Sequence, residues 1–91
     1  MIGKQLLRSG TSIGANVREA LRAQTRPDFT TKLNIALKEV SETEYWIELL
    51  RDAEYISVSQ AESMLTDCVE LLKILTSIVK KTKENTSLLN D

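Results

Sequence analysis

Residues 4–22 read KQLLRSGTSIGANVREALR and alternate basic, apolar and small residues. On a helix that advances about 100° per residue, the basic residues of this part of the chain fall within one arc of about 80°. These residues are Lys4, Arg8, Arg18, Arg22 and, beyond the quoted stretch, Arg26. The opposite side of the helix carries Leu6, Ile13, Val17, Ala20 and Leu21. The pattern predicts an amphipathic helix over about 3–24 with one cationic and one apolar face.

A run of small residues interrupts this helix pattern between Ser9 and Ala15. Each glycine in a helix interior costs up to about 1 kcal/mol, so helix propensity alone disfavours a helix here. Gly10 and Gly14 are four residues apart at the edge of the apolar face, where they would let a neighbouring helix approach closely. The alternative is a flexible loop that breaks the helix after Arg8.

Two further helices are marked by their caps. Thr25 can cap a helix whose first turn contains Pro27 and Asp28, which predicts a helix over about 27–53. Ser57 followed three residues later by Gln60 predicts a third helix over about 57–82. From Lys80 onward the composition becomes polar, so residues 83–91 are expected to form a frayed tail.

The fold class predicted is all-α, because no period-2 alternation is visible and the chain has only one proline and three glycines. Short connections predict an antiparallel up-down helical bundle in a single domain over residues 1–82. The apolar stripe of the third helix is wider than one neighbour can cover, so we expect the bundle to be oligomeric. The predicted oligomer-interface or core residues are Leu6, Ile13, Val17, Leu21, Trp46, Val69 and Ile74.

Composition argues against an enzyme. The chain has no histidine and a single cysteine, Cys68, which excludes histidine-based acid catalysis, a multi-cysteine metal site and an intrachain disulfide. We therefore expect no catalytic residue, no metal, no cofactor and no small-molecule substrate, and Cys68 is expected to be a small buried hydrophobe. The start of the chain does not resemble a secretory signal, and no apolar run approaches the ~20 residues that span a bilayer. The predicted localisation is cytoplasmic, without a membrane partner.

Charge divides the chain into two halves. Residues 1–38 hold seven basic against two acidic residues, whereas residues 39–91 hold five basic against eleven acidic residues. The acidic residues include a cluster on the second predicted helix, at Glu39, Glu42, Glu44 and Glu48, which is expected to be a solvated or intersubunit charged face. Such asymmetry can recruit a polyanion to the basic half, or it can make two copies of the chain complementary to each other.

Three distinctive motifs extend over nearly the whole chain. They are Gln5-Leu-Leu-Arg-Ser-Gly-Thr-Ser-Ile-Gly-Ala-Asn-Val-Arg-Glu-Ala20, then Arg26-Pro-Asp-Phe29 with Leu33 and Ile35-Ala-Leu-Lys-Glu39, and finally Glu42-Thr-Glu-Tyr-Trp-Ile-Glu-Leu-Leu50. In these motifs the chain closely resembles the four-helix-bundle family of 23S rRNA-intervening sequence proteins. The resemblance implies a small cytoplasmic bacterial protein that assembles as a ring-like homopentamer.

The resemblance also implies a nucleic-acid partner. A related accessory protein of diversity-generating retroelements is similar in fold and uses a basic surface to engage nucleic acid. By that analogy the nucleic-acid-binding residues would be Lys4, Arg8, Arg18, Arg22 and Arg26. One departure is that family members usually have a further amphipathic helix before the segment that begins here at Ile2. Either the start of this sequence is placed too late, or the apolar face that this helix would cover, at Leu6, Ile13 and Leu21, is covered by another subunit.

Two functions follow as hypotheses. The first is a non-enzymatic, self-assembling helical bundle that binds RNA or a ribonucleoprotein through its basic helix face. The alternative is a purely structural or protein-interaction module, in which the basic residues pair with Glu19, with acids of the second helix or with another subunit. Asn16 is expected to hydrogen-bond across helices in either case.

Overall fold

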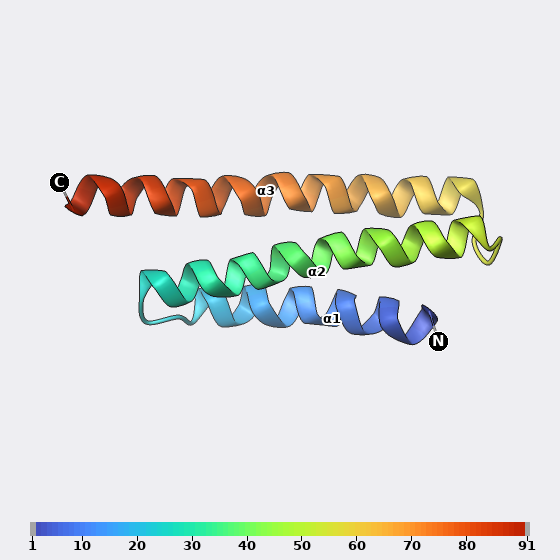
Figure 1. Cartoon of the computed structure of the whole chain (residues 1–91), viewed down its shortest axis with the longest axis horizontal. Helices are drawn as coiled ribbons and strands as arrows, with labels where there is room; N and C mark the ends of the chain where they lie inside the picture. Colours follow the sequence, from blue (N-terminus) through green and yellow to red (C-terminus); the bar gives the residue numbers. More distant parts are fainter. Residues whose placement is uncertain (1, 91) are drawn as a thin grey trace.

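The computed structural model describes the backbone of residues 2–90 and the side chains of residues 3–84. The described backbone forms three α-helices, which are α1 (Ile2–Leu21), α2 (Arg26–Asp52) and α3 (Val58–Asn90). They lie side by side with alternating direction, and α2 is in the middle (Figure 1). The prediction of an all-α chain with three antiparallel helices is confirmed over these residues.

Helix α1 continues through the small-residue run without a break. The loop after Arg8, which low helix propensity allowed, is therefore not formed. The hydroxyl of Thr11 hydrogen-bonds back to the carbonyl oxygens of Leu7 at 2.9 Å and Arg8 at 3.0 Å, as exposed helical Thr residues can. The helix ends at Leu21, three residues before the predicted end, because the amides of Arg22 and Ala23 turn back to carbonyls three residues earlier.

Helix α2 begins at the predicted cap. Thr25 has an extended backbone, and its Oγ1 accepts a hydrogen bond from the amide of Asp28 at 3.2 Å. The helix ends at Asp52 in a turn that the sequence did not reveal. Glu54 adopts a positive φ of 63°, and the amide of Tyr55 bonds the carbonyl of Leu50 at 2.9 Å. This is the Schellman arrangement, which usually places glycine where Glu54 stands.

Helix α3 begins with the predicted capping box, and both of its hydrogen bonds are formed. The amide of Gln60 donates to Ser57 Oγ at 3.0 Å, and the amide of Ser57 donates to Gln60 Oε1 at 2.9 Å. The helix continues to Asn90, beyond the predicted end near residue 82. The predicted frayed tail, residues 83–91, falls mostly outside the part whose side chains the structure describes.

The three helices form a layer instead of a closed three-helix bundle. Among the described residues α1 packs on α2 and α2 packs on α3, whereas α1 and α3 make no close backbone contact. The molecule is accordingly flat, with Cα extents of 53 × 20 × 13 Å. An open groove of about 520 Å³ lies across the layer, and residues from all three helices line it, among them Leu7, Gly10, Ile47, Met64 and Cys68.

The core follows the contact lines between neighbouring helices. Its fully or nearly buried apolar side chains are Ala20, Leu33, Ala36, Val40, Ile47, Ala61, Cys68, Leu75 and Val79. Between α1 and α2 the core also contains a polar pair, because the hydroxyls of Ser9 and Thr43 are hydrogen-bonded at 2.9 Å. Ser9 is completely buried and Thr43 is 8% exposed. Small side chains at this point allow α1 and α2 to lie close together.

Candidate nucleic-acid interface

The predicted cationic residues come from two helices and the link between them. Lys4 and Arg18 lie on α1, Arg22 lies just beyond its end, and Arg26 is the first residue of α2. The prediction of one continuous helical stripe was therefore wrong for the last two, because α1 ends at Leu21 and the chain reverses. All four side chains are exposed. The site is better described as a cationic surface around the α1–α2 turn, with Lys4 at the far end of α1.

Arg8 is engaged by α2. Its guanidinium donates to Glu42 at 2.9 Å and lies 3.6 Å from a carboxylate oxygen of Glu39, while its Nε donates to Gln5 at 3.2 Å. The hydrogen bond to Glu42 is the main reason that the pKa of Arg8 is raised, and the charges of Glu42 and Glu39 add to it while desolvation opposes it. Arg8 thus serves pairing between helices, as the alternative hypothesis described.

Arg18 and Arg22 have a different environment. Together with Thr11, Gly14, Ala15 and Glu19 they line a shallow open hollow of about 680 Å³ on the outer side of α1. Within the described part of the chain neither arginine has an ion-pair partner. The small residues Gly14 and Ala15 leave the surface of α1 open next to the two arginines.

The one carboxylate in this hollow is drawn towards α2. Glu19 forms an ion pair with Lys32 of α2 at 2.9 Å. The hydrogen bond to Glu19 is the largest cause of the raised pKa of Lys32, followed by the charge of Glu19. Because Glu19 is held by Lys32, its charge is partly compensated before any partner arrives.

Three exposed lysines of α3 were missing from the predicted site. They are Lys80 and Lys81, at the polar end of the predicted third helix, and Lys83, in the predicted frayed tail. Each lies on a regular helix in the structure, and none forms an ion pair with a described residue. The available signal was the local run of lysines, but only the fold shows which part of α1 and α2 this run accompanies.

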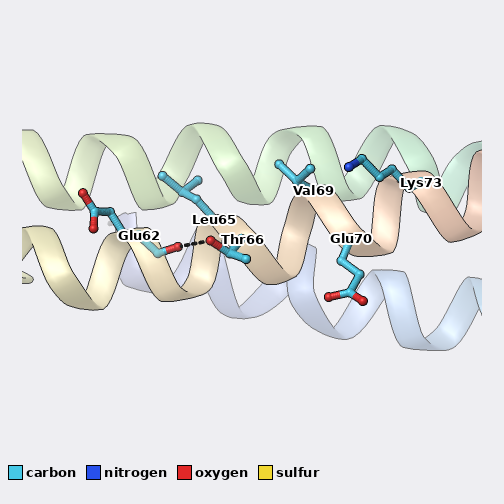
Figure 2. A pocket seen from close by; sticks show the side chains of 6 residues that line it. All are labelled: Glu62, Leu65, Thr66, Val69, Glu70 and Lys73. Carbon is cyan, nitrogen blue, oxygen red and sulfur yellow. Dashed lines mark hydrogen bonds between the residues drawn. The ribbon is translucent and has the colours of Figure 1, made fainter.

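The predicted apolar residues divide into two groups. Leu6, Ile13 and Val17 are partly buried and pack against the core, as expected for core residues. Leu21 is 77% exposed, Ile74 is 51% exposed and Val69 is 43% exposed. Figure 2 shows Val69 with Leu65 and Lys73 along one side of α3, in a shallow hollow that Glu62 and Glu70 also line. Whether the exposed group meets another subunit remains a prediction.

Trp46 is partly buried and makes an edge-on contact with Tyr45 at a ring-centroid distance of 5.0 Å. Its indole nitrogen is buried and has no hydrogen-bond partner among the described residues. The prediction that Asn16 bonds across helices is wrong, because its amide donates within α1 to the carbonyl of Ser12 at 2.9 Å and to its hydroxyl at 3.2 Å. Ser9, which carries a shorter side chain on the buried face, makes the cross-helix bond instead.

The glycines of α1 have no close neighbour within this chain. A Cβ atom built on Gly3, Gly10 or Gly14 would meet nothing within 4 Å apart from its own helix. The close helix approach predicted from these glycines is therefore not made between the described helices. Cys68 is buried at 9% exposure, as predicted, and desolvation is the main cause of the raised pKa of its thiol.

The described residues give no sign of two other kinds of site. Among them, no group of three or more cysteine, aspartate or glutamate side chains is placed to hold a metal ion. No helix in the described part of the chain is long and apolar enough to cross a membrane.

Comparison with known proteins places this geometry in a family. One similar solved structure is a protein of unknown function from the S23 ribosomal protein family of Bacteroides thetaiotaomicron VPI-5482, with 61% sequence identity and a TM-score of 0.86. The similarity covers 88% of this chain and 74% of that one. The comparison with curated proteins gives no match. Residues 1–77 match the family described as 23S rRNA-intervening sequence protein, and the chain therefore belongs to that family.

Proposed function

We propose that this chain is a non-enzymatic helical protein that self-assembles and binds RNA through the cationic surface around its α1–α2 turn. The observation that carries the proposal is the state of Arg18 and Arg22. Both are exposed, they line a hollow together with the small residues Gly14 and Ala15, and neither is paired with a described residue. Arg26, the first residue of α2, adds to this exposed positive charge, whereas Lys4 lies at the far end of α1.

Phosphate is the ligand that fits this surface. The planar guanidinium fork of arginine donates two parallel hydrogen bonds to a phosphate, and a polyanion gains further from each added cation. None of the three aromatic residues of α2, and no other aromatic residue, lines the hollow. Because base stacking needs an aromatic platform, we expect recognition of the RNA backbone and its shape, with little sequence preference.

Self-assembly is supported by the apolar surface that the layer leaves uncovered. Leu7 lines the open groove and is 68% exposed. Leu21, the last residue of α1, is 77% exposed. A chain of 91 residues buries little more than about 60% of its unfolded surface, so further burial by association adds stability that the single chain lacks. The resemblance to the family makes a homopentamer the expected assembly.

The first prediction concerns the two arginines. We expect the double variant Arg18→Glu with Arg22→Glu to abolish binding to a single-stranded RNA in a fluorescence anisotropy titration. The affinity of the parent should fall steeply as salt is raised from 50 to 200 mM, by about 2.6-fold for each phosphate contact to a single strand. Light scattering should show the same oligomer for both proteins, because neither side chain lies in the groove.

A matched control keeps the charge change and moves its position. The variant Lys38→Glu with Lys73→Glu alters two exposed lysines that do not line the hollow, and it should retain most of the RNA affinity. Equal losses in both double variants would show that only net charge matters and would count against a defined site on α1.

The second candidate is a purely structural module, and a specific observation favours it. Arg8 is already paired with Glu39 and Glu42, and Lys32 with Glu19, so part of the charge pattern holds α1 to α2. If the parent binds no RNA and the arginine double variant falls apart into single chains, this second function replaces the first.

A further inference from the structure

The antiparallel packing of α2 and α3 determines which charges lie at the same end of the molecule. Both helices start from the α2–α3 turn and advance about 1.5 Å per residue, so residues equally far from that turn lie level with each other. Arg26 begins α2 at the far end, 26 residues before Asp52, and the residue of α3 equally far from Val58 is Glu84. Lys80, Lys81 and Lys83 therefore lie within about 6 Å of the level of Arg26 along the axis.

Helix α1 brings its positive charge to the same end of the molecule. The link between α1 and α2 is only residues 22–25, so the last turn of α1 lies beside the start of α2. Figure 1 shows this turn at the same end of the molecule as the C-terminal half of α3, with α2 between α1 and α3. Arg18, Arg22 and Arg26 thus share one end of the molecule with the three lysines. We call these six residues the basic end.

The basic end is open and poorly neutralised. All six side chains are exposed, and none has an ion pair with a described residue. The acidic groups near it are Glu19, which is held by Lys32, and Asp28 and Glu84. The opposite end, around the α2–α3 turn, carries Glu48, Asp52, Glu54 and Glu62. The charge asymmetry of the sequence therefore appears in the fold as a basic end and an acidic end along the 53 Å long axis.

We propose that the RNA backbone is bound by the whole basic end, with the lysines of α3 as the second half of the site. This inference rests on the proposed function and extends it from α1 to all three helices. Packed helices lie about 8–10 Å apart, so the distance from α1 across α2 to α3 is about 20 Å. An RNA strand that crosses the layer passes all three helices, and one phosphate for each cation of the basic end gives at most six contacts.

The test is the salt dependence of binding, because its slope counts the phosphates that are neutralised. For single-stranded RNA the logarithm of the binding constant falls by about 0.7 per phosphate for each tenfold rise in salt. With a 20-residue oligouridylate as probe, the parent should show a slope of about −4. The variant Lys80→Gln, Lys81→Gln, Lys83→Gln should show a slope of about −2 and bind about 100-fold more weakly near 0.1 M salt.

A control variant removes three positive charges elsewhere, at Lys38, Arg51 and Lys73, each changed to glutamine. It should keep the parent slope, and circular dichroism should show that every variant retains the helix content, since glutamine and lysine have similar helix propensities. If the lysine variant keeps the parent slope while Arg18→Glu with Arg22→Glu abolishes binding, the site is confined to α1 and the inference is wrong, although the proposed function stands.

Two other outcomes overturn the inference in different ways. If the parent shows no salt-dependent RNA binding, the proposed function fails and the inference fails with it. If the lysine variant leaves RNA binding unchanged but dissociates the oligomer in light scattering, the basic end meets the acidic end of a second copy instead of RNA.

Discussion

The residue that most constrains the packing of α1 is one of the smallest. Ser9 is completely buried against α2, where its hydroxyl is hydrogen-bonded to Thr43 and to the carbonyl of Leu6 at 3.2 Å. A larger side chain at this position would have to push the two helices apart, because a packed interface has no spare volume.

We therefore predict that Ser9→Val lowers the free energy of unfolding by about 1–3 kcal/mol, through overpacking and the loss of a buried hydrogen bond. Urea unfolding followed by circular dichroism would measure it. Thr11→Val is the control, since it places the same side chain on α1 at an exposed position and should stay within about 0.5 kcal/mol of the parent. Similar losses in the two variants would contradict the role assigned to Ser9.

Single residues also show where prediction from sequence stops. The positions of Leu6, Ile13 and Val17 follow from helical periodicity, which is a property of one helix, and they pack as expected. The partners of Arg8 and Asn16 depend on the register between two helices and on side-chain reach. Periodicity does not contain that register, so the sequence allowed a cross-helix bond for Asn16 that the structure gives to Ser9.

At the scale of the helices, starts were easier to predict than ends. Thr25 and Ser57 mark the starts of α2 and α3 through side chains that cap the free amides, and both caps are formed. The end of α2 depends on Glu54 in a left-handed conformation, a role that glycine or asparagine would have signalled. The early end of α1 and the long α3 likewise lack a cap residue that a reader of the sequence could use.

The left-handed conformation of Glu54 gives a prediction at this scale. A non-glycine residue with φ near +60° has a steric cost of about 1–2 kcal/mol in the folded state. Glycine removes this cost but loses more conformational entropy on folding, so only part of it is regained as stability. Glu54→Gly should therefore raise the free energy of unfolding by about 0.5–1 kcal/mol. Glu54→Ala, which keeps the Cβ atom, should give little change in the same urea titration. A destabilised glycine variant would show that the turn does not hold this conformation in solution.

At the scale of the molecule, the three helices and their alternating direction followed from amphipathic patterns and short connections. The arrangement of the helices in a layer could not be predicted in this way. A pattern of apolar residues shows how much of a helix surface is to be buried, but it does not show which helix buries it. Leu21 was grouped with the buried face of α1, yet it is 77% exposed because α3 packs only on α2. The basic end could not be predicted for the same reason, because the packing of α3 on α2 is what brings the lysines of α3 to the same end as the arginines.

This uncovered surface leads to the last prediction. Burying a leucine side chain contributes about 1.5–3 kcal/mol, so Leu7 and Leu21 would together favour association strongly while adding little to the single chain, where both are exposed. Leu7→Gln with Leu21→Gln should reduce the mass in light scattering to one chain of 10.2 kDa and leave the helix content unchanged. Tyr55→Gln with Val58→Gln removes side chains that are 78% and 61% exposed at the α2–α3 turn and should leave the oligomer intact. A parent that is already a single chain, or equal dissociation by both double variants, would remove this surface as the site of assembly.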